Sequence, residues 1–423
     1  MNPLGIDQCM REIAECCGTP FYVYGLDEIQ HSFASLQAAL GPQTHILYSM
    51  KANPNPFIAQ ALVELGAGVE AASGGELRLA LCCGVSAERI VFAGPGKTDE
   101  ELQLAVEAGI LAVNVESINE ADRLQRISDS AGRRTRATLR VNPLQPVGDA
   151  RIQMGGCASQ FGVDQEWAEE VLQYMLGLPA LQCVGVHVYA GTQVLDGQAL
   201  AGHVGRVLAM GHQWAREYGL EMINIGGGFG IPCYPGQTPL DLTPVGQAVA
   251  DAVAEHARLG GQGVGLYAES GRYLVGPAGT YVARIIDIKE SRGLSFVVLD
   301  GGINHHPGST GMGRTIRRNR KLRLVGAESG QPARPVNIVG PLCTSADWLA
   351  EEWEMPANAR VGDLVAIADS GAYCRSASPL GFLSHDWPGE FLVDGLGAWR
   401  CIAPRITAQD VQGLQMEKLA DER

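Results

Sequence analysis

The segment TDEELQLAVEAGILAVNVESINEADRLQRISDSAG, residues 98–132, predicts a helix, a short strand and a second helix in succession. Thr98 is a typical helix N-cap, acids fill the first turn, and apolar residues then recur at helical spacing up to Gly109. The apolar run 112–115 has the length and character of a buried strand. The second helical run again closes on a glycine. This alternation predicts an α/β domain.

Short β-prone runs of the same kind recur along the first two-thirds of the chain, with segments of helical character such as GGELRLALCCG (74–84) between them. They predict eight strands: 46–50, 69–72, 90–93, 112–115, 137–141, 184–188, 222–225 and 266–269. Eight buried-type strands that alternate with helices favour a (β/α)8 barrel. Periodicity alone leaves a doubly wound open sheet as the alternative.

The pattern changes after about residue 276. Strand-like segments follow one another with turns and little helix between them: 279–291, 294–302, 333–341, 362–373 and 389–395. They predict a β-rich sandwich or barrel domain. The segment PFYVYGL is also strand-like and precedes the first barrel helix, so we expect it to pair into that domain. The predicted boundaries are 28–276 for the barrel and 277–423 for the β domain, which the N-terminal residues 1–27 join.

The amino-acid composition argues against several classes of protein. The 423 residues are 46% hydrophobic and 18% charged, with a net charge of −14 that disfavours general nucleic-acid binding. No apolar run approaches the ~18 residues that span a bilayer, and the N-terminus lacks the apolar region of a signal peptide. We therefore expect a cytoplasmic protein. The eleven cysteines show no CxxC spacing, which favours reduced thiols and no zinc site.

Polar residues and glycine occupy the predicted carboxyl ends of the strands, where barrel active sites form. They are Lys51, Ser73, Arg140, Tyr189, Gly226 and Glu269. On the segment HILYSMKANPN (45–55) alone, a solvated surface lysine would be the commoner explanation of Lys51. Their shared position instead predicts one common mouth.

The chemistry of these residues suggests a cofactor. Gly226, Gly227 and Gly228 follow the seventh strand, and consecutive glycines let backbone N–H groups approach a phosphate closely. In YAESGRYL, Glu269 ends the eighth strand and Arg272 lies three residues on. A lysine for a Schiff base, donors for a phosphate and a carboxylate beside a ring nitrogen are what a phosphorylated pyridine cofactor needs.

Two glycine-rich segments lack the spacing of nucleotide-binding loops. INIGGGFGIP has Ile231 where the dinucleotide fingerprint needs glycine, and GPGKT (94–98) has Val91 where a Walker A loop needs glycine.

Taken together, the motifs resemble those of the fold-type III pyridoxal-phosphate decarboxylases, the family of ornithine and diaminopimelate decarboxylases. The resemblance runs nearly end to end and is specific because the motifs occur in a fixed order. Its motifs are YSMKAN (48–53), EAASGGEL (70–77), FAGPGK (92–97), LRVNP (139–143), GVHVYAGTQ (185–193), GGGFG (226–230), ESGR (269–272), GPLCTSAD (340–347) and SGAY (370–373). Within the family, the stretches GTQ, ESGRYL, GPLCT and SGAY resemble those of a glutamyl-carrier-protein decarboxylase of secondary metabolism.

The resemblance implies removal of the α-carboxylate of an amino acid with pyridoxal 5'-phosphate as cofactor. Lys51 would carry the cofactor, Glu269 would pair with its ring nitrogen, and Cys343, donated by the partner subunit of a homodimer, would reprotonate the α-carbon. The phosphate would be held by Gly226 to Gly228, Arg272 and Tyr373, and further cofactor contacts would come from Ser73, Arg140 and Tyr189.

Three departures from the family pattern bear on the substrate and the site. Tyr189 stands where the family has a ring-stacking histidine, with His187 expected in the core, and Glu70 stands where the family often has aspartate. Thr344 follows Cys343 where members with diamine substrates carry an acid. A buried ammonium without a carboxylate is costly, so an uncharged distal end, as in a carrier-bound glutamyl thioester, fits better. Asp347 lies near enough to compensate, which leaves free diaminopimelate, lysine, ornithine or arginine as the alternative.

The basic run GRTIRRNRKLR (313–323) contains six cations and no acid. It fits either a solvated loop or a dock for an acidic acyl carrier protein, and Arg314 or Arg317 could instead clamp a substrate carboxylate. The adjacent histidines His305 and His306 predict no metal site, because neighbours in sequence cannot easily share one ion.

Two other classes share part of the pattern. An alanine-racemase-type enzyme would place arginine at the position of Glu269 and lack GPLC. A non-catalytic regulator would lose cofactor contacts that this chain keeps.

Overall fold

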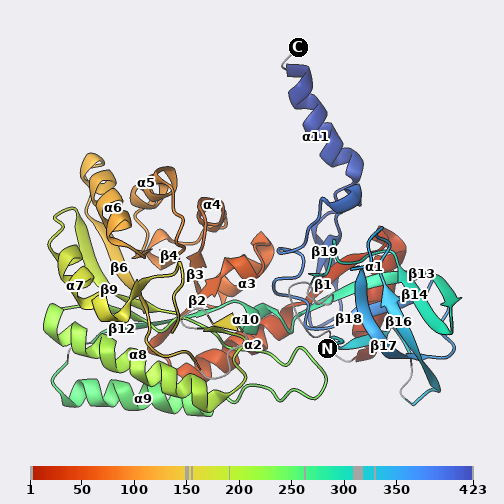
Figure 1. Ribbon diagram of the computed structural model, residues 1–423, viewed down its shortest axis with the longest axis horizontal. Coiled ribbons are helices and arrows are strands. Elements are labelled where there is room, and N and C mark those ends of the chain that lie inside the picture. Colours follow the sequence, from red (N-terminus) through yellow and green to blue (C-terminus); the bar gives the residue numbers. More distant parts are fainter. Residues whose placement is uncertain are drawn as a thin grey trace. The chain divides into compact units, whose positions relative to one another are not determined.

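The computed structural model describes residues 3–147, 152–153, 156–189, 191–261, 263–307, 318–327 and 330–421 (Figure 1). The chain forms two compact units. The barrel unit comprises Gln30–Ile231 and Thr238–Leu274, and the β-rich unit comprises Met1–Ile29, Pro232–Gln237 and Val275–Arg423.

The barrel unit is built on eight parallel strands that close on themselves, in the order β5-β4-β3-β2-β12-β11-β9-β6 with β5 paired to β6. The strands are β2 (Thr44–Ser49), β3 (Gly68–Ala71), β4 (Ile90–Phe92), β5 (Ala112–Val115), β6 (Thr135–Asn142), β9 (Leu181–Val188), β11 (Met222–Asn224) and β12 (Gly265–Ser270). Each of the eight predicted runs overlaps one of them. The (β/α)8 barrel is therefore confirmed, and the closing pair excludes the open sheet.

Helices alternate with these strands: α2 (Leu26–Leu40), α3 (Pro56–Glu64), α4 (Gly74–Cys82), α5 (Asp99–Ala108), α6 (Ile118–Ser130), α7 (Gln165–Leu176), α8 (Gly197–Tyr218), α9 (Thr243–Arg258) and the short α10 (Arg272–Val275). Thr98 and Glu101 form a capping box at the start of α5, and Gly109 ends that helix with φ of 65°. Smaller elements are η1 (Met50–Ala52), η2 (Ala87–Arg89), β8 (Val163–Asp164) beside β6, and the pair β7 (Ile152–Gln153) and β10 (Gly191–Thr192).

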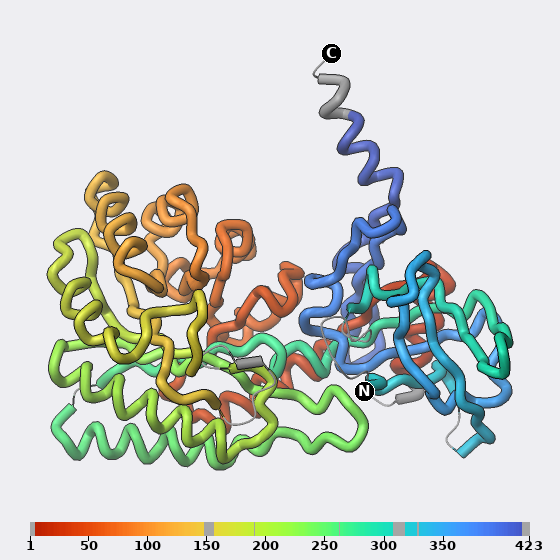
Figure 2. Tube along the Cα trace, in the orientation of Figure 1, coloured from red at the N-terminus to blue at the C-terminus, as the bar shows by residue number. Residues whose placement is uncertain are grey.

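The β-rich unit confirms the predicted change from alternating strands and helices to consecutive strands with little helix between them. Its strands are β1 (Phe21–Gly25), β13 (Gly279–Ser291), β14 (Leu294–Leu299), β15 (Leu322–Leu324), β16 (Ala333–Val339), β17 (Trp348–Pro356), β18 (Leu364–Ile367), β19 (Gly389–Val393) and β20 (Trp399–Ala403), with η4 (Phe382–Ser384) between β18 and β19. Their order is β17-β16-β14-β13-β1-β19-β20, and β18 joins β13 to β15. The N-terminal β1 pairs antiparallel with β13 and parallel with β19, so both ends of the chain share one sheet (Figure 2).

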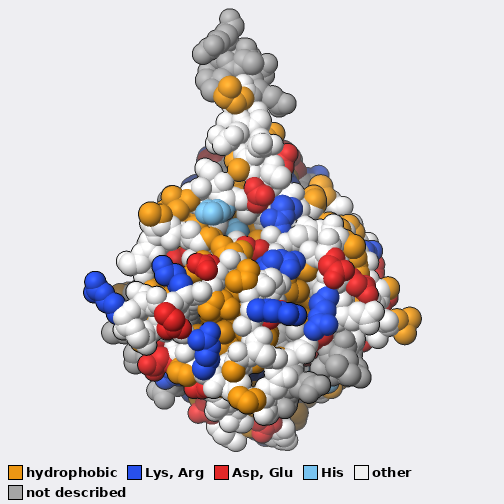
Figure 3. All heavy atoms as spheres, turned by 90° about the vertical axis from the view of Figure 1, so that its right-hand side faces the viewer, with side chains coloured by type: hydrophobic (Ala, Val, Ile, Leu, Met, Phe, Trp, Pro, Cys, Tyr) orange, Lys and Arg blue, Asp and Glu red, His pale blue; other side chains and the backbone are white. Residues whose placement is uncertain are grey.

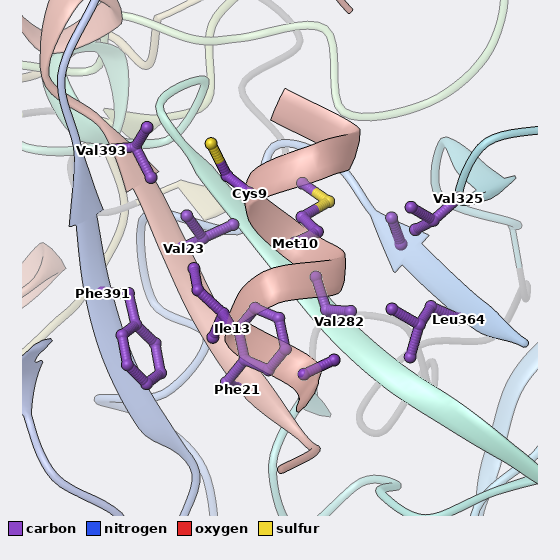
Figure 4. Packing of buried hydrophobic residues seen from close by; sticks show 12 residues of the cluster. Cys9, Met10, Ile13, Phe21, Val23, Val282, Val325, Leu364, Phe391 and Val393 are labelled. Carbon is purple, nitrogen blue, oxygen red and sulfur yellow. The ribbon is translucent and has the colours of Figure 1, made fainter. Parts of the chain in front are cut away.

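Two helices of this unit were not anticipated. In α1 (Pro3–Cys17), Cys9, Met10 and Ile13 pack onto Phe21 and Phe391 of the sheet (Figure 4). The last helix, α11 (Ala408–Asp421), begins after a reciprocal cap between Thr407 and Asp410. Its glutamine, leucine and methionine residues are good helix formers. This local signal for a helix was missed because the preceding segments predict strands. Among the described residues, no helix combines the length and the apolar character needed to cross a membrane.

Candidate active site

Lys51 lies at the carboxyl end of β2, where η1 turns the chain into the mouth of the barrel. Its Nζ atom is 2.8 Å from both carboxylate oxygens of Glu70, which is buried in β3. The same Nζ atom lies 5.9 Å from the centroid of the Tyr189 ring, which follows β9. Three strands thus place an amine, a carboxylate and an aromatic ring together at one end of the barrel.

Glu269 lies at the end of β12, and its side chain is almost fully buried. Its Oε1 atom accepts a hydrogen bond from Asn224 Nδ2 at 2.9 Å and lies 3.2 Å from His187 Nε2. Burial alone would raise the pKa of Glu269, but His187, Lys51 and the Asn224 hydrogen bond outweigh it and lower the pKa from 4.5 to about 2. The barrel mouth therefore holds an ionised carboxylate. His187, expected in the core, is indeed buried but contacts this group directly.

The glycine loop after β11 leaves no room for side chains. A Cβ atom at Gly227 would lie 2.5 Å from the Glu269 carbonyl oxygen, and one at Gly228 would lie 2.7 Å from the Gly191 carbonyl oxygen. Gly226 has φ of 66°, and its N–H donates to Asn224 Oδ1 at 2.9 Å. Bare backbone with left-handed dihedrals is the arrangement that lets a phosphate approach main-chain N–H groups.

Three further predicted residues of the barrel take different positions. Arg272 begins α10, and the preceding Gly271 packs so closely on the Lys51 turn that a Cβ there would lie 2.6 Å from Ala52 Cβ. Ser73 caps α4 and accepts the N–H of Glu76 at 3.2 Å. Arg140 is buried in β6, and its Nη1 atom donates to Glu116 at 2.7 Å. In the structure, Ser73 and Arg140 therefore have contacts that also serve the barrel itself.

The residues predicted beyond the barrel belong to loops of the β-rich unit. Cys343 has an exposed thiol in the loop between β16 and β17, and Thr344 follows it. Tyr373 follows β18 and has φ of 56°, a strained conformation for a tyrosine that is often found at functional sites. Arg314 and Arg317 lie outside the described residues.

Both carboxylate oxygens of Asp347 are occupied by backbone N–H groups. It is buried, its Oδ1 atom accepts the N–H of Ile303 and its Oδ2 atom accepts the N–H of Leu342, both at 2.8 Å. Burial raises the pKa of Asp347, although these two amide bonds oppose the shift. Its carboxylate ties the Cys343 loop to the segment after β14.

His305 and His306 are buried structural residues. His305 Nε2 lies 2.8 Å from the Asp386 carbonyl oxygen, and His306 Nε2 lies 2.9 Å from Ser370 Oγ in the SGAY loop. Burial lowers the pKa of His305 from 6.5 to about 4, and burial and the charge of Arg320 hold the pKa of His306 well below 6.5. Among the described residues, no group of three or more His, Cys, Asp or Glu side chains is arranged to hold a metal ion.

The described members of the basic run are largely occupied within the protein. Arg320 is buried and donates to the Asp369 carbonyl oxygen at 3.1 Å, Lys321 pairs with the Asp369 carboxylate at 2.9 Å, and Arg323 pairs with Asp7 at 2.5 Å. On the face of the β-rich unit drawn in Figure 3, Lys and Arg side chains lie among Asp and Glu side chains. These three cations therefore make contacts within the β-rich unit that stabilise its fold.

Sequence reasoning missed three residues that organise the mouth. Asn224 links Glu269 to the glycine loop, Glu116 accepts the N–H groups of Gly94 and Gly162 as well as Arg140, and Gln193 pairs with the backbone of Ile231. Asn224 is a polar residue in an otherwise apolar strand, a signal that could have identified it.

An amine beside an aromatic ring, a buried ionised carboxylate and a phosphate-sized stretch of bare backbone converge on one barrel mouth. Together they fit a phosphorylated pyridine aldehyde held on Lys51, which defines the class of protein as a barrel enzyme that uses such a cofactor.

The comparisons with known proteins give the family. Residues 26–276 match the model of the pyridoxal-dependent decarboxylase pyridoxal-binding domain. The chain is 36% identical over 404 residues to the L-glutamyl-(BtrI acyl-carrier protein) decarboxylase of Niallia circulans, which covers 94% of each chain. It is 34% identical over 367 residues to the diaminopimelate decarboxylase of Aquifex aeolicus, covering 86% of this chain and 84% of the relative.

Among solved structures, the diaminopimelate decarboxylase of Helicobacter pylori complexed with L-lysine superposes with a TM-score of 0.87 at 27% identity, covering 97% of this chain and all of that one. The chain belongs to the pyridoxal-dependent decarboxylase family. It is a carboxy-lyase that acts on an amino acid with pyridoxal 5'-phosphate as cofactor.

Proposed function

We propose that the substrate is a glutamyl group held as a thioester on an acyl carrier protein, and that the enzyme removes its α-carboxylate. The observation that carries this proposal is the state of Asp347. It is the acid nearest in sequence to Cys343, and both its carboxylate oxygens accept backbone N–H groups in a buried position.

The distal end of the substrate distinguishes a carrier-bound thioester from a free diamino acid. A free diamino acid brings an ammonium, which needs a carboxylate partner when it leaves water. Thr344 offers only a hydroxyl group, and the N–H of Ala346 already donates to it at 3.3 Å. With Asp347 committed to the loop backbone, the Cys343 loop suits an uncharged distal group such as a thioester. The carrier-protein substrate named for the relative from Niallia circulans supports the same choice.

We assign the remaining roles by the same proposal. Lys51 anchors the cofactor and Glu269 pairs with its ring nitrogen, while Tyr189 lies along the ring. Phosphate donors would be Gly226, Gly227, Gly228, Arg272 and Tyr373, with Ser73 and Arg140 as further cofactor contacts, and Arg314 and Arg317 as candidate contacts of the substrate.

When bound, pyridoxal phosphate supplies an electron sink for the electron pair released as the bond from Cα to the carboxylate breaks. Glu269 keeps a negative charge at the ring nitrogen, which favours the protonated ring. Glu70 holds the Lys51 amine at one side of the mouth. The Cys343 thiol then gives its proton to Cα, so a C–H bond replaces the C–C bond and carbon dioxide leaves. Solvent returns a proton to the thiolate.

The proposal includes a homodimer in which Cys343 completes the site of the neighbouring subunit. The exposure of this thiol fits such an arrangement, because a proton donor must reach the substrate from the surface of its own unit. A cytoplasmic location and a role in secondary metabolism complete the proposal.

The test uses Thr344→Asp, with Ser345→Asp as the matched control because Ser345 is the exposed next residue. Carbon dioxide release would be measured with the glutamyl-loaded carrier and with free diaminopimelate, lysine, ornithine and arginine. An unpaired buried carboxylate beside the thioester costs ~1–3 kcal/mol, so kcat/KM for the loaded carrier should fall by about 5- to 150-fold in Thr344→Asp only. Equal effects of the two variants, or a wild-type preference for a free diamino acid, would overturn the substrate assignment.

A further inference from the structure

A small cavity lies in the helix layer of the barrel unit, and neither Lys51 nor Glu70 or Tyr189 lines it. It has a volume of about 110 Å3 and lies between the loop after β6, the first residue of α7, the last residue of β9 and one face of α8. Its polar lining consists of Gln145, Gln165, His203 and Arg206. Because β6 and β9 end beside it, the cavity lies at the same end of the barrel as the cofactor site.

His203 is the deepest polar group of the cavity. Its side chain is 2% exposed, and no hydrogen bond joins it to another described residue. Burial first, and then the charge of Arg206, lower its pKa from 6.5 to about 4. A buried imidazole without a hydrogen-bond partner is costly to a fold, unless a ligand or ordered water supplies the partner.

Arg206 lies one helical turn further along α8 and has no ion pair with a described acid. The cavity lining that the structure describes contains no carboxylate at all. The two glutamines add amide donors, and the Oε1 atom of Gln165 is already occupied by the N–H of Leu144 at 3.0 Å, which leaves its amide nitrogen for a ligand.

The remaining lining is apolar and comes from Pro143, Leu144, Val188, Val207 and Met210. Arg206 is itself exposed, but apolar side chains beside its guanidinium lower the local dielectric constant and so strengthen its attraction to an anion in the cavity. The volume exceeds the ~10–15 Å3 that a single water needs, so the cavity accommodates an ion of several heavy atoms.

We propose that this cavity is a binding site for an oxyanion, a phosphate or carboxylate group, with Arg206 as the counter-ion and His203 as the buried hydrogen-bond donor. A neutral imidazole donates through one ring N–H, and the guanidinium supplies the charge. The oxyanion has two possible sources. One is a free metabolite anion, and the other is the phosphate of a prosthetic arm on a carrier protein that docks at this end of the barrel. The site itself does not depend on the carrier-bound substrate, because it rests on the cavity alone.

The experiment titrates inorganic phosphate into the cofactor-loaded enzyme, so that the cofactor's own phosphate occupies the glycine loop. Thermal stability would be followed at constant ionic strength, with chloride as the reference anion. Arg206→Gln tests the site, and Arg216→Gln is the matched control, since it removes the same charge from the same helix at a residue that contacts His256 instead. Because Arg206 is exposed and makes no ion pair with a described acid, its replacement should leave the fold intact.

Phosphate should stabilise the wild type and Arg216→Gln in a saturable way, with a dissociation constant at least about tenfold weaker in Arg206→Gln, the size of one charge-assisted hydrogen bond. Absence of saturable stabilisation, or an equal response in Arg206→Gln, would overturn the proposal.

A second arm separates the sources. Carrier protein with and without its phosphate-bearing arm would be titrated into wild type and Arg206→Gln. Arm-dependent binding that weakens in Arg206→Gln assigns the site to the carrier, whereas binding that is insensitive to the variant assigns it to a free anion. A failure of carrier binding altogether would count against the proposed substrate but not against the oxyanion site.

Discussion

Replacing Glu269 by glutamine should lower kcat by about 10- to 150-fold, because it would remove the charge that, in the role proposed for Glu269, keeps the cofactor's ring nitrogen protonated. The carboxylate is 2% exposed, so water does not screen it, and a hydrogen bond to a charged group under such conditions contributes ~1.5–3 kcal/mol. A contact that would be stronger in the transition state than in the bound substrate contributes equally to kcat and kcat/KM, so both should fall together. The glutamine oxygen can still accept the hydrogen bond from Asn224, which preserves the local fold.

The assay is steady-state carbon dioxide release together with the absorbance of bound cofactor, which reports that the site remains loaded. Glu221→Gln makes the same exchange just before β11, at the opposite end of the barrel, and should retain wild-type kcat. A cofactor-loaded Glu269→Gln enzyme with undiminished kcat would refute the assigned role of this carboxylate.

The remaining predictions concern the β-rich unit. Cys343→Ser should lower kcat by at least about tenfold while the cofactor stays bound, because it removes the proposed proton donor. Cys401 is another exposed thiol of the same unit, and Cys401→Ser should leave kcat unchanged. Equal activity of the two variants would show that Cys343 is not the proton donor. Asp347→Asn should lower the free energy of unfolding by ~1–3 kcal/mol, because one of the two backbone N–H groups would then face the amide group of asparagine, which is itself a donor. Urea titration measures this change, and an unchanged unfolding midpoint and slope would contradict the prediction. His306 is buried and its pKa lies well below 6.5, so below that pH the unfolded chain binds a proton at this residue that the folded protein does not bind. The free energy of unfolding should therefore fall as pH decreases from about 6.5, by up to ~1.4 kcal/mol per pH unit. His306→Gln should flatten that slope, and an unchanged slope would show that other groups cause it.

The barrel could be read from sequence because its signals are local. Each strand is a short apolar run, and each helix carries its own caps, as Thr98 and Gly109 do for α5. The positions of Lys51 and Glu269 followed from the same periodicity, since residues at strand ends share one mouth. Closure itself, through the pairing of β5 with β6, is a contact between strands that no local pattern encodes.

The contacts that decide the substrate argument lie beyond such patterns. Asp347 and Ile303 are far apart in sequence, so the hydrogen bond that occupies this carboxylate emerged only from the fold. A sequence interpretation had to leave Asp347 as a possible partner of a distal ammonium. Likewise, Asn224 joins Glu269 to the glycine loop across neighbouring strands, and the hydrogen-bonding partner of a buried amide cannot be deduced from its own position.

The most direct test of the account is intact-protein mass spectrometry of a glutamyl-loaded carrier incubated with the cofactor-loaded enzyme. Free diaminopimelate, lysine, ornithine, arginine and glutamate would be assayed in parallel for carbon dioxide release. The account predicts that the loaded carrier loses the mass of one carbon dioxide while the free amino acids remain intact. An unchanged carrier beside rapid turnover of a free diamino acid would contradict it, and would identify an amino-acid decarboxylase whose substrate ammonium finds its partner elsewhere than at Thr344 and Asp347.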